Sequence, residues 1–99
     1  MHITKEHIAY KKVIGKLRKN GAPVHEIRTT GGLYLVVASD GKNLRTLGTG
    51  PHRAVARFIA EKNEPDLLIT DLSKSDAIDE ATLLLWADVF QKITARLQK

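Results

Sequence analysis

The first part of the chain carries apolar positions at helical spacing. Tyr10, Val13, Ile14 and Leu17 recur at intervals of three and four residues, which places them on one stripe of an α-helix. The pattern predicts an amphipathic helix over residues 4–19. The opposite side of this helix is expected to carry a stripe of cations, namely Lys5, Lys12, Lys16 and Lys19.

Three short apolar segments follow, each bounded by turn residues. Segments 24–30 and 33–38 are rich in β-branched and large apolar residues, and a glycine pair lies between them. An Asp-Gly pair, which a tight hairpin prefers because its centre needs positive φ, precedes the shorter segment 44–47. The pattern predicts three antiparallel strands in a meander.

Two further helices are predicted after the strands. Pro51 follows a Gly-x-Gly break and suits a first helical position, so a helix is expected from there to about residue 62. Segment 67–70 is either a short extra strand or a packed linker, since its length does not decide between them. The last helix is expected over about residues 75–97, with an apolar face wide enough to need cover from the domain itself or from another copy.

This order of elements predicts an α+β fold. A three-stranded antiparallel sheet would have two helices packed on one face, and a C-terminal helix would extend it. The 99 residues suit a single domain, with a core over residues 4–62 and a C-terminal extension over 66–99.

The residues of this core resemble the double-stranded RNA-binding domain, over about residues 4–62. Residues 23–26, Pro-Val-His-Glu, are similar to that family's Pro-x-Tyr-Glu entry into its first strand. Residues 48–57 are similar to its Gly-x-Gly followed by Lys-Lys-x-Ala-Lys, with Arg53 and Arg57 in the first and third basic places and an alanine in the second. The resemblance implies an α-β-β-β-α fold and binding of duplex RNA.

The net charge of +5 is unevenly distributed along the chain. Residues 1–62 hold twelve Lys/Arg against four Asp/Glu, a balance of +8, whereas residues 63–99 hold four against seven, a balance of −3. This segregation suggests a basic working surface that contacts the phosphates of nucleic acid, with duplex RNA the first choice and DNA the second. The candidate binding residues are Lys5, Lys12, Arg28, Thr29, His52, Arg53 and Arg57.

Arg53 and Arg57 are the centre of this hypothesis. They lie at a predicted helix start, where free backbone N–H groups and the helix dipole favour an anion. The alternative is that the lysines form only the solvated face of a helix. His52 is either a phosphate donor or a helix-start residue without a binding role.

Patterns of catalysis are absent from the sequence. There is no cysteine, and the four histidines show no metal-ligand spacing. Asp76, Asp79 and Glu80 are better explained as acidic residues that favour a helix N-terminus than as a metal cluster. Gly48-x-Gly50 lacks the further residues of a nucleotide-binding fingerprint. We therefore expect a non-enzymatic protein without a cofactor.

A protein-interaction module is the competing interpretation. Trp86 and Phe90 lie on the wide apolar face of the last predicted helix and would serve a protein partner or a homodimer.

No signal peptide or membrane span is evident, so a cytoplasmic protein without membrane contact is expected.

Overall fold

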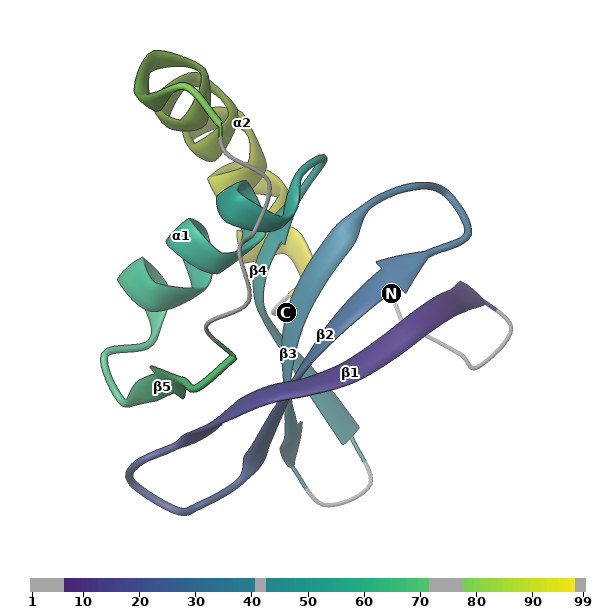
Figure 1. The fold of residues 1–99 in the computed structure, drawn as a ribbon, viewed down its shortest axis with the longest axis vertical. Coiled ribbons are helices and arrows are strands. Elements are labelled where there is room, and N and C mark those ends of the chain that lie inside the picture. Colours follow the sequence, from purple (N-terminus) through teal and green to yellow (C-terminus); the bar gives the residue numbers. More distant parts are fainter. Residues whose placement is uncertain (1–6, 41–42, 72–77, 98–99) are drawn as a thin grey trace.

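The computed structural model describes residues 7–40, 43–71 and 78–97. In these ranges the chain forms five strands and two helices, in the order that Figure 1 shows. The elements are β1 (Ile8–Leu17), β2 (Pro23–Thr29), β3 (Tyr34–Asp40), β4 (Asn43–Gly50), α1 (Arg53–Asn63), β5 (Leu67–Ile69) and α2 (Glu80–Leu97).

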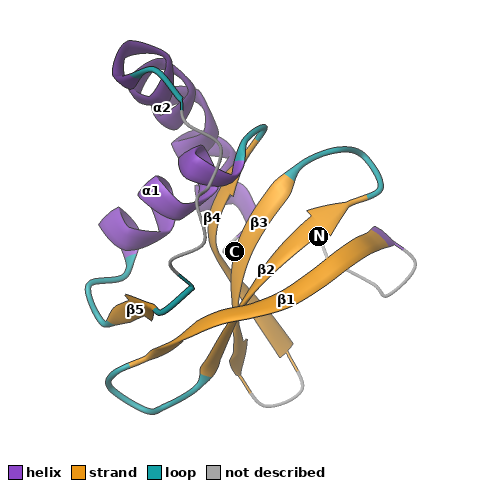
Figure 2. Ribbon diagram, viewed as in Figure 1, coloured by secondary structure: helices purple, strands orange, loops and turns teal. Residues whose placement is uncertain are grey.

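All five strands belong to one curled antiparallel sheet, a half-barrel with the order β4-β3-β2-β1-β5 (Figure 2). The two helices stand at the β4 side of the sheet, and β5 pairs with the end of β1. Residues directly opposite one another on neighbouring strands share a face. We call the face that carries Val24, Glu26 and Val36 the inner face, because its apolar residues pack against α1.

The prediction of a three-stranded sheet with two helices on one face is wrong. Residues 8–17 form strand β1 and not part of a helix over 4–19, and β1 pairs with β2 along its length. The open question about segment 67–70 is also answered, because Leu67–Ile69 is strand β5. The coarser prediction of a small α+β domain is confirmed.

A β-bulge explains why β1 resembles a helix in the sequence. Val13 pairs with His25 and Gly15 pairs with Val24, so Ile14 is an extra residue on β1. The bulge interrupts the two-residue alternation, and Ile14 and Leu17 both enter the core although they are three residues apart. Tyr10 and Val13, the other residues of the predicted stripe, are exposed.

Two glycines allow close approaches to the sheet, one by helix α1 on β4 and one by β5 on β1. A Cβ on Gly48 would lie 2.1 Å from the Ala56 carbonyl oxygen of α1. At the other side of the sheet a Cβ on Gly15 would lie 1.9 Å from the Leu68 carbonyl oxygen of β5. The inner-face core then closes around Val36, Leu47 and the small residues of α1.

Helix α2 contacts α1 and β4. It begins at Glu80, later than the predicted start near residue 75, and Asp79 caps it by accepting a hydrogen bond from the Thr82 backbone N–H at 3.1 Å. Ala87 and Phe90 of α2 pack against Val55 and Ile59 of α1 in a second apolar cluster.

In the part of the chain that the structure describes, neither helix is long and apolar enough to cross a membrane.

Candidate nucleic-acid interface

Two tyrosines and an arginine form one row across the inner face. Tyr10 of β1 lies opposite Arg28 of β2, and Arg28 lies opposite Tyr34 of β3. Since residues opposite one another point to the same side of a sheet, the three side chains are neighbours. We call Tyr10, Arg28 and Tyr34 the aromatic row.

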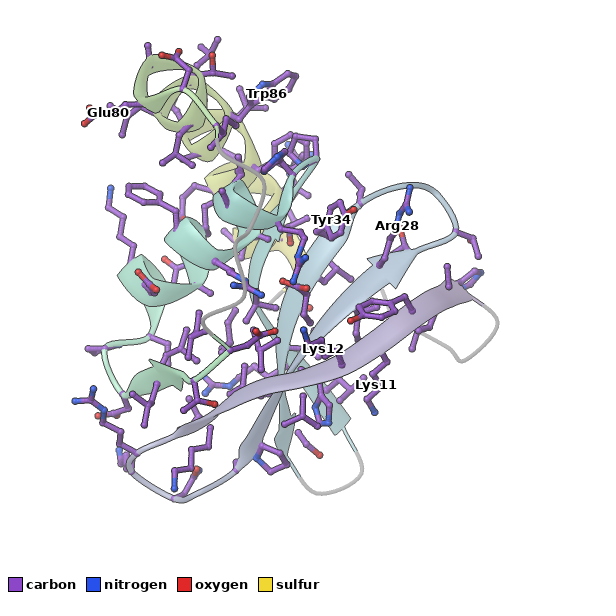
Figure 3. The ribbon with its side chains drawn as sticks, in the orientation of Figure 1. Lys11, Lys12, Arg28, Tyr34, Glu80 and Trp86 are labelled. Carbon is purple, nitrogen blue, oxygen red and sulfur yellow. The ribbon has the colours of Figure 1, made fainter. Side chains whose placement is uncertain are left out.

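The aromatic row is open to solvent. Tyr10 is 45% exposed, Arg28 is exposed and Tyr34 is half-buried. The Arg28 guanidinium carbon lies 5.7 Å from the centroid of the Tyr34 ring, which is within the range of a cation–π contact. Figure 3 shows these two side chains together where β2 ends and β3 begins. The row therefore presents flat rings and a cation on one surface.

The next row of the inner face contains a buried acid, Glu26, between Lys12 of β1 and Val36 of β3. Glu26 is only 1% exposed. Arg53 and Arg57, one turn apart on α1, both reach it. Arg53 Nη2 lies 2.8 Å from Glu26 Oε1, and Arg57 Nε donates a hydrogen bond to Glu26 Oε2 at 2.9 Å.

Asp71, just after β5, extends this group of charges. Arg57 Nη2 lies 3.8 Å from Asp71 Oδ2, and Lys12 Nζ forms an ion pair with the same oxygen. We call Lys12, Glu26, Arg53, Arg57 and Asp71 the ion-pair network. It ties β1, β2, α1 and the segment after β5 to one another, so it fixes the start of α1 over the sheet.

Burial of a carboxylate normally costs several kcal/mol unless it is paired and hydrogen-bonded. Glu26 meets that condition through two guanidinium groups, which compensate its charge. The hydrogen bond to Glu26 is the main cause that raises the pKa of Arg53 above its usual value, against a smaller opposing effect of burial. Arg53 and Arg57 are thus engaged by carboxylates within the chain.

The predicted binding residues fall into different places. Lys12, Arg28, Arg53 and Arg57 come together on the inner face, although the Arg57 side chain is only 11% exposed. Figure 3 shows that Lys12 and its neighbour Lys11 leave β1 on opposite sides. Lys5 lies outside the described residues.

Thr29 and His52 have local structural contacts. Thr29 Oγ1 accepts a hydrogen bond from the Leu33 N–H at 3.1 Å in the turn between β2 and β3. His52 is the N-cap of α1, and its Nδ1 accepts a hydrogen bond from the Ala54 N–H at 3.2 Å. Both residues therefore shape the segments beside the aromatic row.

The sequence interpretation missed the two tyrosines and the two acids of this surface. The helical spacing places Tyr10 on the apolar stripe of a helix, and Tyr34 falls within the predicted strand 33–38. No strand signal is present around Tyr10, because the polar pair Lys11-Lys12 and the apolar pair Val13-Ile14 break the alternation that marks a half-buried strand. No local pattern links Glu26 to arginines 27 and 31 residues further along the chain.

The two residues predicted for a protein interface lie differently on α2. Phe90 is buried in the cluster with α1, whereas Trp86 is 40% exposed. Their ring centroids are 5.8 Å apart in a tilted arrangement. Beside Trp86, α2 exposes the apolar side chains of Leu84, Leu85 and Val89.

The charges around the aromatic row do not cancel. Arg28, Lys12, Arg53 and Arg57 supply four cations, and Glu26 and Asp71 supply two carboxylates, which leaves an excess of +2. Within the described ranges, no three His, Asp or Glu side chains are grouped in a way that would hold a metal ion. The chemistry of the surface is therefore that of cations and aromatic rings.

Comparison with known proteins finds no matching family, no similar curated protein and no similar solved structure. The functional interpretation rests on the surface just described.

Proposed function

We propose that this protein binds nucleic acid through the aromatic row and the cations beside it. The observation that carries the proposal is the row itself: an exposed arginine between two tyrosines on one face of an antiparallel sheet. Arginine binds phosphate with a planar array of donors, and aromatic rings offer surfaces on which bases stack. The excess of positive charge beside the row supports attraction of a polyanion.

Each part of the surface has its own role in this proposal. Arg28 is the principal phosphate ligand, because no carboxylate pairs with it in the described residues. Arg53 and Lys12 are held by Glu26 and Asp71 and add positive potential at the same face. Arg57 positions the start of α1 through its contacts with both acids. Binding of duplex RNA stays a prediction, and a titration of the native protein with labelled duplex RNA tests it.

A charge-reversal pair tests the proposal. Fluorescence anisotropy with labelled oligonucleotides is measured for the native protein, for Arg28→Glu and for Arg18→Glu. Arg18 is also exposed but lies in the turn after β1, at the far end of the strand from Tyr10. Both variants change the net charge by the same amount, so the difference between them reports the location of the site. We expect Arg28→Glu to lose at least about tenfold more affinity, since a contact to a charged group is worth about 1.5–3 kcal/mol.

A second matched pair uses adjacent lysines on opposite faces of β1. Lys12→Gln removes a cation from the inner face, and Lys11→Gln removes one from the outer face. The proposal expects weaker binding for the first variant only. Equal effects of Arg28→Glu and Arg18→Glu, or no binding of any oligonucleotide by the native protein, would contradict it.

Self-association through α2 is the second candidate function. The exposed side chains of Leu84, Leu85, Trp86 and Val89 support it, because large apolar residues clustered on one helix are typical of an interface. The expected occupant is α2 of a second copy. Sedimentation velocity over a concentration series should show a dimer that Leu85→Glu dissociates, whereas a monomer at all concentrations would exclude the candidate.

A further inference from the structure

The geometry of the aromatic row points to single-stranded nucleic acid as the ligand, and this inference rests on the nucleic-acid binding proposed above. We infer that one base stacks on Tyr10 and a neighbouring base stacks on the unit formed by Arg28 and Tyr34. The phosphate between them is then placed near the cations of the inner face. A duplex does not offer this contact, because its bases are already stacked and paired.

The spacing of the row suits separate bases. Tyr10 and Tyr34 lie on strands separated by β2, so their backbones are about 10 Å apart at roughly 4.8 Å per strand. Arg28 occupies the position between them and lies over the Tyr34 ring. The row therefore has two stacking surfaces, an exposed ring on β1 and a guanidinium backed by a ring on β3.

The rings are held on a rigid support. Tyr34 packs partly against the inner-face core, and Tyr10 lies on a strand that the ion-pair network connects to α1 through Lys12 and Asp71. An aromatic side chain also has few rotatable bonds, so little conformational entropy is lost when a base stacks on it. Both features favour stacking as a source of affinity.

The modest charge of the surface supports the same conclusion. A protein that makes about 6–10 phosphate contacts with DNA loses about 10³–10⁵ in affinity between about 50 and 200 mM salt, so charge dominates its affinity. Near the aromatic row the described residues place four cations, with two carboxylates beside them, and the further inner-face cation Arg45 is paired with Glu64. Phosphate contacts alone are too few here, whereas stacking contributes about 1–3 kcal/mol for each base.

Three probes of equal length distinguish this inference from the proposed function. They are an oligothymidylate of about ten nucleotides, within the usual range of site sizes of about 4–16, an abasic oligonucleotide with the same number of phosphates, and a duplex of the same length. We expect the oligothymidylate to bind at least about tenfold more tightly than the other two. Equal affinity for oligothymidylate and abasic probe, or tighter binding of the duplex, would overturn the inference and leave nucleic-acid binding intact.

Variants of Tyr10 provide the second readout. Tyr10→Leu keeps an apolar side chain but removes the ring, and Tyr10→Phe keeps the ring. We expect Tyr10→Leu to lose about tenfold in oligothymidylate affinity, with no change for the abasic probe, and Tyr10→Phe to bind normally. Circular dichroism confirms that each variant is folded. If Tyr10→Leu binds oligothymidylate as well as the native protein, stacking on Tyr10 is excluded.

Failure of the native protein to bind any of the three probes overturns both the inference and the proposed function.

Discussion

Glu26 is a carboxylate in the interior of the molecule, and the residues around it compensate for its burial. It is 1% exposed, and its two carboxylate oxygens are engaged by Arg53 and Arg57. Removing one partner from such a group costs more than the net value of the contact, because the remaining charge stays buried. The stability of the inner face should therefore depend on these arginines.

We predict that Arg57→Ala lowers the free energy of unfolding by about 2–3 kcal/mol, since a hydrogen bond to a buried charged group is lost. The matched control is Arg45→Ala, because Arg45 pairs with Glu64 at the surface and its side chain is 47% exposed. We expect at most about 1 kcal/mol for that exposed pair. Urea denaturation measures both values. Equal losses for the two variants would show that Glu26 does not need Arg57.

His25 provides a pH-dependent contribution to stability. Burial, and to a lesser extent the charge of Lys11, lowers the pKa of His25 from its ordinary value of 6.5, and its Nδ1 is buried without a hydrogen-bond partner. A group with a lowered pKa in the folded state binds fewer protons there than in the unfolded chain. The contribution of neutral His25 to stability is present in full above pH 6.5. It is lost as the pH falls through the lowered pKa that His25 has in the folded state.

The expected result is a decrease in the free energy of unfolding between about pH 7 and pH 5 that is smaller in His25→Asn than in the native protein. Denaturation curves at several pH values measure this difference. Identical pH profiles for the two proteins would show that His25 stays equally accessible to protons in the folded and unfolded states.

Residue types alone point to part of this candidate surface. Arg28, Arg53, Arg57 and Lys12 are predicted from charge and from the position of the arginines at a helix start, and their binding of nucleic acid stays a prediction. The acids that hold three of these cations were not found, because Glu26 and Asp71 meet them only through the pairing of strands and the packing of α1. Their roles follow from long-range contacts that no local spacing encodes.

At the scale of elements, the fit of α1 against β4 depends on Gly48. Gly48 has no side chain at the point where the Ala56 carbonyl oxygen and the Ala60 backbone of α1 approach β4. We predict that Gly48→Ala lowers the free energy of unfolding by about 3 kcal/mol or more, because the added methyl group forces α1 away from the sheet.

Gly31→Ala is the control for this prediction. Gly31 lies in the turn between β2 and β3, and its added Cβ would meet only Thr29 Oγ1 at an ordinary distance of 3.7 Å. We expect a change within about 0.5 kcal/mol. Thermal denaturation compares the two variants, and a small effect of Gly48→Ala would mean that α1 moves away from the sheet at little cost.

The elements differ in how well the sequence predicted them. Strands β2, β3 and β4 and helix α1 have strong turn and start signals, and their predictions are close to the observed bounds. Strand β1 was predicted as a helix because the bulge at Ile14 gives its buried residues a spacing of three. The sheet then gains β1 and β5, and the inner face gains Tyr10 and Lys12. A bulge depends on the partner strand, so its position cannot be read from β1 alone.

At the scale of the whole molecule, the charge balance along the sequence overstates the charge at the proposed site. The first 62 residues carry +8, yet Lys11 leaves β1 on the side opposite Lys12, and Arg18 lies at the far end of that strand. The carboxylates Glu26 and Asp71 also neutralise part of the inner face. Folding thus divides a basic segment into a local excess of about two charges and other cations elsewhere on the molecule.

This local excess predicts how affinity depends on salt. Each phosphate that a protein neutralises on a single strand contributes a slope of about −0.7 to the plot of log affinity against log salt concentration. With about two phosphates neutralised, the slope for oligothymidylate should be about −1.4, and Arg28→Gln should bring it closer to about −0.7.

Lys11→Gln is the control for this measurement and should leave the slope unchanged, because Lys11 lies on the outer face. Anisotropy titrations from low to physiological salt give all three slopes. A native slope steeper than about −4 would require six or more phosphate contacts, more than the cations of the inner face provide. The ligand would then extend over a larger basic surface, and stacking on the aromatic row would be a minor part of its affinity.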